Sequence, residues 1–134
     1  MLRSALAGLL TGLMLAVGLP AASAGDPEFG RMWRDDGVLR EGCHRYKYHY
    51  KVKPPKPDWA LETFLVDPTG ETIASGGFIS GNDPKRGTGK FRFCEYNTKP
   101  GRFKLRGKLT YREGFQQWVV WVKPKFFRLR ADTS

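Results

Sequence analysis

The chain is poor in the residues from which enzymes and metal centres are most often built. Its 134 residues include only two cysteines and two histidines, and its 13 acidic residues are outnumbered by 23 lysines and arginines. His44 and His49 share one short segment, without a nearby serine or free cysteine that would indicate a nucleophile and its base. Only Asp35 and Asp36 are adjacent among the acidic residues. We therefore expect a non-enzymatic protein that holds no metal or other cofactor.

Long apolar runs are missing after the first 20 residues. An apolar stretch from Ala5 to Leu19 follows Arg3, and residues 22–24 (ASA) have the small-x-small form of a signal-peptidase site. A retained membrane anchor is the alternative, but glycines interrupt the stretch and Pro20 ends it short of the ~20 apolar residues that span a bilayer. We predict a cleaved signal peptide over residues 1–24. The protein would then be secreted or extracellular, and either associated with the cell envelope or released.

Helical periodicity is absent from the remaining segment, which at about 110 residues suffices for one small domain. Polar and apolar residues alternate instead, most clearly over residues 102–111 (RFKLRGKLTY). Further strands are predicted around residues 38–39 and over residues 44–52, 59–66, 71–79, 90–94 and 117–122, the last resuming at 126–130 after Pro124.

Seven strands with frequent turn signals predict an all-β fold, namely a single antiparallel Greek-key β-sandwich of immunoglobulin-like architecture over residues 37–130. A small closed barrel is the structural alternative. Residues 25–36 show no sustained period and are interpreted as a flexible N-terminal lead or a short edge segment. The polar run 80–89 is interpreted as a loop and residues 131–134 as a C-terminal tail.

The two cysteines are out of step with the aromatic residues beside them. Cys43 lacks the parity of Tyr46, and Cys94 lacks that of Phe91. If the two strands pair antiparallel with Cys43 opposite Cys94, Tyr46 falls opposite Phe91, and apolar side chains meet on one face. We therefore predict one disulfide across neighbouring strands, on the outer or rim side of the sandwich. A β-bulge that turns Cys43 inward is the alternative.

Basic residues occupy the polar positions of several predicted strands, and the formal net charge is +10. Such an excess attracts anionic surfaces and polymers, although a solvated surface without a partner has the same composition. Because the strands around residues 45 and 105 belong to opposite sheets of a sandwich, we expect two basic outer faces. The predicted polyanion-binding residues are Arg45, Lys47, Lys51, Lys90, Arg92, Arg102, Lys104, Arg106 and Lys108.

Two aromatic residues are candidates for contact with a partner. Trp121 has the opposite parity to Trp118, Val120 and Val122, and Tyr96 follows the second cysteine onto its face. An exposed tryptophan can stack on a sugar ring or anchor a protein. A strand buried on both sides would remove Trp121 from solvent, and that alternative stays open.

The segments CHRYKYHYKV, DWALETFL, FRFC, KPGRFKLRGKL and VVWVKP are similar to those of small exported immunoglobulin-like proteins of high-GC Gram-positive bacteria. The resemblance covers about residues 40–130 and implies export and a sandwich, but carries no activity. The expected function is a binding module attracted to anionic cell-envelope polymers or acidic partners, without specific nucleic-acid binding. A specific protein-binding or inhibitor-like domain is the alternative.

Overall fold

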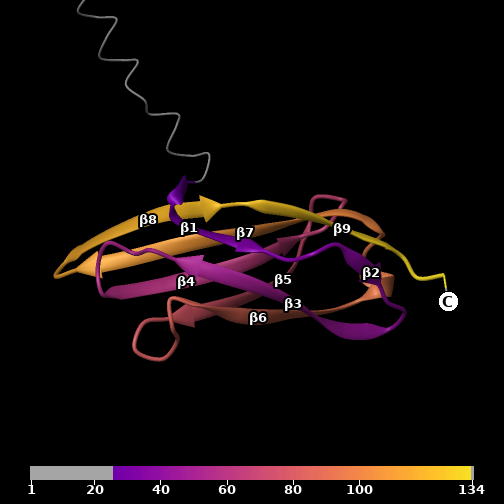
Figure 1. Ribbon diagram of the computed structural model, residues 1–134, viewed down its shortest axis with the longest axis horizontal. Helices are drawn as coiled ribbons and strands as arrows, with labels where there is room; N and C mark the ends of the chain where they lie inside the picture. The colour runs from indigo at the N-terminus through magenta and orange to yellow at the C-terminus, as the bar shows by residue number, and fades with distance from the viewer. Residues whose placement is uncertain (1–25, 134) are drawn as a thin grey trace, which may run out of the picture.

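The computed structural model describes residues 26–133, which form nine strands and a short 3₁₀ helix, η2. The strands, shown in Figure 1, are β1 (Asp26–Trp33), β2 (Gly37–Leu39), β3 (Cys43–Val52), β4 (Asp58–Val66), β5 (Thr72–Ile79), β6 (Arg86–Cys94), β7 (Gly101–Glu113), β8 (Gln116–Lys123) and β9 (Lys125–Ala131), with η2 at Glu95–Asn97. Residues 1–24, for which a signal peptide is predicted, lie outside the described residues.

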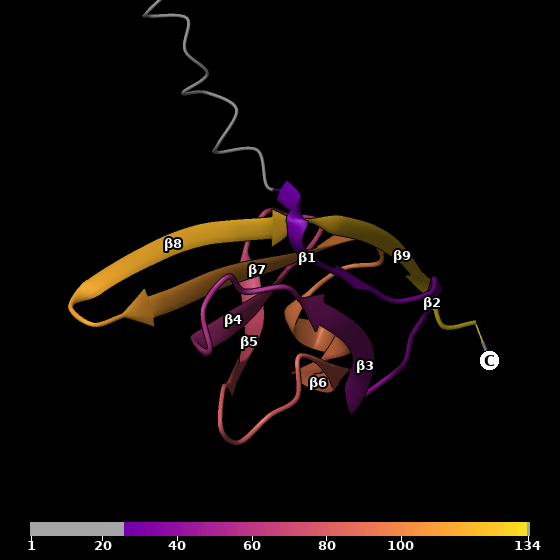
Figure 2. The ribbon, with the colours of Figure 1, turned by 60° about the vertical axis from the view of Figure 1, so that its left-hand side comes forward.

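The strands form two layers that face each other across the core. One layer has the order β1-β3-β6, and the other has β5-β4-β7 followed by β8 and β9, which share the remaining edge of β7. The links β3–β4, β5–β6 and β6–β7 each cross from one layer to the other. This Greek-key arrangement confirms the immunoglobulin-like β-sandwich. Figures 1 and 2 both show the β7–β8 hairpin projecting beyond the body of the sandwich.

The layers are continuous along one side because β8 pairs with β7 and also with β1. The β1–β8 pair is parallel, as is the β2–β9 pair, so the sheet is mixed and not purely antiparallel. On the opposite side no β5–β6 ladder is present among the described residues, so the sandwich does not close into a barrel there. Pro124 separates β8 from β9, as its lack of an N–H donor predicts.

Two segments predicted to be irregular are strands. Residues 26–33, expected as a flexible lead or a short edge segment, form β1, which pairs with both β3 and β8 and whose Met32 side chain is buried in the core. Residues 86–89, expected as part of a loop, are the first half of β6. In residues 86–89 glycines stand where a core strand usually carries bulk, and in β1 the large residues Phe29 and Met32 do not share one parity. Pairing with neighbouring strands, and not local periodicity, therefore makes these two segments strands.

Glycines in β6 make room for tyrosine rings from β3. Gly89 lies opposite Tyr48 and Gly87 opposite Tyr50 in the antiparallel register. A β-carbon at Gly89 would lie 2.5 Å from the Tyr48 ring, closer than packing allows. The buried Tyr48 hydroxyl is bonded to the Thr63 hydroxyl at 2.8 Å, and burial raises the pKa of Tyr48. The tyrosine rings of β3 thus occupy the space that side chains at Gly87 and Gly89 would otherwise fill.

The β3–β6 register agrees with the predicted one. Cys43 lies opposite Cys94 and is bonded to it, and Tyr46 lies opposite Phe91. The ladder runs from Cys43 to Lys51 without a register shift, so the alternative of a bulge beside Cys43 is wrong. The disulfide lies on the outer side, where the Tyr96 hydroxyl is 3.9 Å from the Cys43 Sγ atom.

A buried carboxylate organises the β4–β5 turn. Asp67 Oδ1 accepts hydrogen bonds from the Thr69 and Glu71 backbone N–H groups and from the Thr69 hydroxyl, while Oδ2 accepts one from the Thr98 hydroxyl. Burial alone would raise the pKa of Asp67, but these hydrogen bonds outweigh it and hold the pKa below its ordinary value. The carboxylate therefore joins the turn to the segment that precedes β7.

Replacement of the Asp67 carboxylate should make the free energy of unfolding depend less on pH in the acidic range. Because the folded-state pKa is lowered, the contribution of Asp67 is fully present above its unfolded pKa, about 3.9, and is lost as pH falls through the folded value. We expect Asp67→Asn to lower the free energy of unfolding by about 1–2 kcal/mol at neutral pH. The deficit should shrink below about pH 4, as measured by urea denaturation across pH. Glu71→Gln, at an exposed neighbouring carboxyl, is the control, and an equal effect there would refute the assignment.

Candidate polyanion-binding face

The outer side of the β1-β3-β6 layer carries a dense set of cations. Arg45 lies opposite Arg92, Lys47 opposite Lys90, and Lys51 opposite Arg86. On its other side β3 pairs with β1, which places Arg31 beside Lys51. Neither β3 nor β6 contains an aspartate or glutamate. We call this set the basic face: Arg31, Arg45, Lys47, Lys51, Arg86, Lys90 and Arg92.

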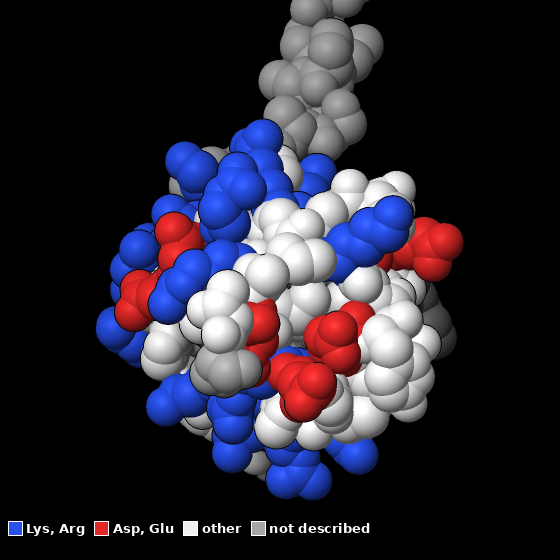
Figure 3. All heavy atoms as spheres, turned by 90° about the vertical axis from the view of Figure 1, so that its right-hand side faces the viewer, with Lys and Arg blue, Asp and Glu red and all other residues white. Residues whose placement is uncertain are grey.

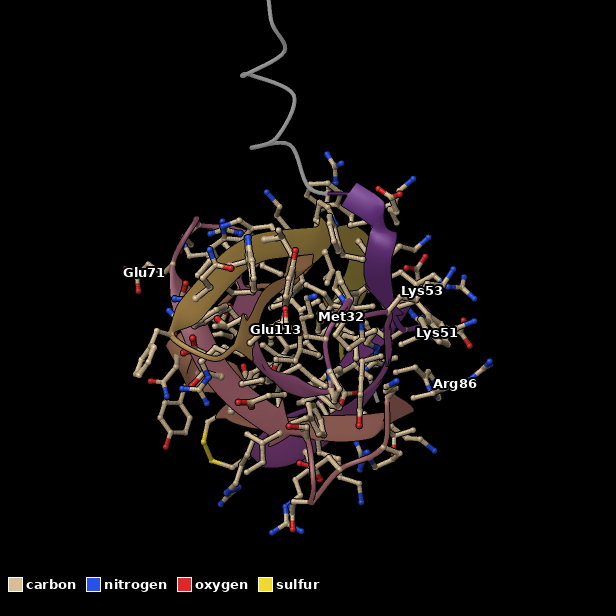
Figure 4. The ribbon with its side chains drawn as sticks, turned by 90° about the vertical axis from the view of Figure 1, so that its left-hand side faces the viewer. Met32, Lys51, Lys53, Glu71, Arg86 and Glu113 are labelled. Carbon is tan, nitrogen blue, oxygen red and sulfur yellow. A yellow bond between two sulfur atoms is a disulfide. The ribbon has the colours of Figure 1, made fainter. Side chains whose placement is uncertain are left out.

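The cations point away from the core. Figure 4 shows Lys51 and Arg86 directed outward on one side of the sandwich, with Met32 toward its interior. Like charges directly opposite each other in an antiparallel ladder destabilise it, typically by a few tenths of a kcal/mol. The basic face contains three such pairs in one ladder. This arrangement does not serve folding, and a bound anion would relieve the repulsion.

An aromatic residue lies within the basic face. The Trp33 indole stacks on the His49 ring, with 5.3 Å between ring centroids. The Arg31 guanidinium carbon lies 4.5 Å from the centre of the indole, and that of Arg86 lies 6.0 Å from it. Both distances are within the range of cation–π attraction. The indole therefore groups two guanidinium groups from different strands.

A groove continues the positive surface around the edge of the layer. Its volume is about 360 Å³, and its lining includes Arg31, Trp33, Lys123, Pro124 and Lys125. The groove lies beside β1 at Pro124, which separates the end of β8 from the start of β9. This break places Lys123 and Lys125 at the groove. Arg31 and Trp33 belong both to the groove and to the basic face, which makes one connected cationic surface.

The second predicted basic face, on β7, has a different character. The Arg102 guanidinium lies 3.7 Å from the centre of the Phe126 ring, and that of Arg106 lies 4.2 Å from the centre of the Trp121 ring. Lys104 lies 5.6 Å from the Phe126 ring, and Lys108 forms an ion pair with Glu62 at 3.3 Å. These four cations already have partners within their own layer, although Arg102 also lies opposite Arg128 of β9.

The structure thus divides the nine predicted polyanion-binding residues into two groups. Five lie on the basic face, namely Arg45, Lys47, Lys51, Lys90 and Arg92, and the four others lie on the β7 face. Trp121 has the predicted outward parity, but it is only half-exposed because Arg106 covers it. Tyr96 is 74% exposed beside the disulfide.

Sequence reasoning did not select Arg31, Trp33 or Arg86 as site residues. Arg31 and Trp33 fall in the segment interpreted as a lead, and Arg86 falls in the segment interpreted as a loop. A signal for Arg86 was present, since residues 86, 88, 90 and 92 are polar and alternate with Gly87, Gly89, Phe91 and Phe93. Treating glycine as a possible inward residue would have extended that strand.

Acidic residues are most evident at one end of the molecule. Figure 3, which looks onto the end near β2, shows acidic side chains in the middle of that end, with others among the lysines and arginines at its left edge and at its right edge. A pocket of about 140 Å³ is lined there by Glu41, Glu95 and Asp132, among others. Beside the basic face, Asp35 and Asp36 line a second cavity together with Arg31 and Trp33, so acidic side chains adjoin the cations there.

Comparison with known proteins assigns no family. Neither a scan against models of protein families nor a search of curated proteins gives a match. A solved CARDB domain of the PF1109 protein from Pyrococcus furiosus, in complex with di-metal ions, gives a TM-score of 0.39 at 13% sequence identity, and the match covers 78% of this chain and 90% of that chain. At this score the likeness carries no argument about function.

Two kinds of feature are absent from the described part of the chain. Within residues 26–133 no group of three or more histidine, cysteine, aspartate or glutamate side chains is placed to hold a metal ion. Over the same residues no helix has the length and apolar character needed to cross a membrane.

Reversal of one charge in the like-charge ladder should stabilise the fold. Lys90→Glu would place a carboxylate opposite Lys47, so we expect the free energy of unfolding at low salt to rise by about 0.5–1 kcal/mol. High salt should remove most of the gain by screening. Urea denaturation at low and high ionic strength measures both effects. Lys99→Glu, in an exposed loop, makes the same change in net charge. An equal gain there would show that net charge alone is responsible.

Proposed function

We propose that this protein is a non-enzymatic binding module that uses its basic face to hold an extended anionic polymer. The observation that carries the proposal is the ladder of like-charge pairs on β3 and β6, Arg45 with Arg92, Lys47 with Lys90, and Lys51 with Arg86. Without an anion these pairs oppose folding, and with one they become charge-assisted contacts.

The shape of the face suits a linear ligand. Successive outward positions of a strand are separated by about 7 Å, so the cation pairs form two rows that run along the strands for most of their length. Side chains of β1 and the adjoining groove extend the surface at one end. An unbranched polymer lying along β3 would contact several pairs at once, which favours avidity over recognition of one small molecule.

The predicted location agrees with this role. A signal peptide would export the chain, and a disulfide persists in oxidising compartments. Anionic polymers of the cell envelope are then the ligands that the protein would meet first. In this proposal, binding depends on electrostatic attraction and does not involve turnover of the polymer.

Binding of dextran sulfate and polygalacturonate to the purified protein, measured by titration calorimetry over roughly 25 to 500 mM NaCl, tests the proposal. We expect affinity to fall steeply with salt, because bound cations displace counterions from the polymer. Lys47→Gln with Lys90→Gln should weaken binding at low salt about tenfold and flatten the salt dependence. Lys104→Gln with Lys108→Gln removes the same charge from the β7 face and should change affinity less than about threefold.

Two outcomes would contradict the proposal. One is the absence of polymer binding by the wild-type protein at low salt. The other is equal weakening by both double substitutions, which would show that total charge matters and the basic face does not.

Protein binding is a second candidate, supported by the 74% exposure of Tyr96 beside the disulfide. An exposed aromatic residue on a rigid support is typical of interface anchors. The half-exposed Trp121 favours this candidate less, because Arg106 already lies on its ring. Saturable binding of an envelope protein that persists in high salt and is lost in Tyr96→Ala would support it. Salt-sensitive binding that Tyr96→Ala leaves unchanged would refute it.

A further inference from the structure

Three cations lie side by side across three neighbouring strands at one end of the basic face. Arg31 of β1 pairs in register with Lys51 of β3, which in turn pairs with Arg86 of β6. Adjacent strands are separated by about 4.8 Å, so the three side chains rise from a strip only two strand spacings wide. Figure 4 shows Lys51 and Arg86 extending outward together.

Trp33 distinguishes this row from the other pairs of the ladder. It lies beside the row, stacks on His49, and has the guanidinium groups of both Arg31 and Arg86 over its ring. A guanidinium that stacks on an aromatic ring keeps its N–H groups in the plane free to donate. Because the ring restricts both side chains before a ligand arrives, less conformational entropy is lost on binding. Within residues 26–133 no aromatic ring lies at cation–π distance from Arg45, Lys47, Lys90 or Arg92.

The donors in this row set the chemistry of the ligand. Each guanidinium presents a planar fork that can donate two parallel hydrogen bonds, and Lys51 adds an ammonium group. A carboxylate has only two coplanar oxygens, which a single fork occupies. The terminal group of a phosphate or sulfate monoester has three oxygens directed tetrahedrally, so it can accept from two forks and one ammonium group together.

We propose that Arg31, Lys51 and Arg86 form a clamp for a phosphate or sulfate ester group carried by the polymer, with Trp33 as the residue that positions the two arginines. This inference rests on the proposed function and names the class of ligand. It makes the protein selective for phosphorylated or sulfated polymers over polymers that carry only carboxylates. The rest of the basic face then supplies attraction that does not depend on anion geometry.

Affinities for dextran sulfate, dextran phosphate and polygalacturonate of matched charge and length test the clamp. We expect the wild-type protein to bind at least one of the first two polymers about tenfold more tightly than polygalacturonate. Arg31→Lys with Arg86→Lys keeps the net charge but removes the forks, and it should abolish most of this preference while changing the affinity for polygalacturonate less than twofold. Arg45→Lys with Arg92→Lys is the matched control and should retain the preference.

The sulfated and the phosphorylated polymer together show which kind of ester the clamp binds. A preference for dextran sulfate alone supports a sulfated ligand, and a preference for dextran phosphate alone supports a phosphorylated one. Competition by inorganic sulfate or phosphate, lost in the Arg31/Arg86 variant, would place the group at the clamp. The single substitution Arg86→Lys, at an exposed position, should lower the preference partly and provides the test if the double variant does not fold.

The clamp and the proposed function can fail separately. Equal wild-type affinity for all three polymers would overturn the clamp and leave polyanion binding intact. The same loss of preference in the Arg45/Arg92 control would also overturn it, because any arginine pair would then suffice. If no polymer binds at low salt, the proposed function fails with it.

Discussion

The register of β3 against β6 is the constraint on which most of this molecule depends. The same alignment joins Cys43 to Cys94, places the Tyr48 ring over Gly89, and brings cations together in pairs on the outer side. A slip of one residue would exchange the two faces of β3, moving lysines inward and tyrosines into water. The disulfide and the ring–glycine contacts therefore protect the placement of the charges as well as the core.

The two faces of the β1-β3-β6 layer have opposite energetic roles. Its inner side contributes stacked aromatic pairs such as Tyr48 with Phe91, at 4.2 Å between centroids, and its outer side carries mutually repelling charges. The β7 cations Arg102, Lys104, Arg106 and Lys108 lie on rings or pair with a carboxylate, and of these four only Arg102 lies opposite another cation, Arg128 of β9. The β3–β6 ladder brings together three like-charge pairs, and this concentration is the physical reason for assigning ligand binding to the basic face.

Periodicity in the sequence was enough to predict the sandwich, the β3–β6 register and the outward position of most cations. It failed where glycine replaces a core side chain, as in the first half of β6, and where a strand is held mainly by its neighbours, as in β1. For that reason five cations of the basic face were predicted from the sequence, but Arg31, Trp33 and Arg86 of the proposed clamp were not, since all three lie in those two segments. Periodicity also does not reveal that Arg106 covers Trp121, because the two residues lie on different strands.

The parallel pairing of β1 with β8 and of β2 with β9 bears on the order in which the chain can fold. Parts of the sheet that are synthesised first are completed only by the part that is synthesised last. Contacts between the two ends of a chain form slowly, since a long loop must close before they are gained. A chain that crosses a membrane channel from its N-terminus would remain incomplete until its final strands emerged. Such a chain would stay unfolded enough to pass through the channel. The clamp would then form only after the whole domain had crossed the membrane.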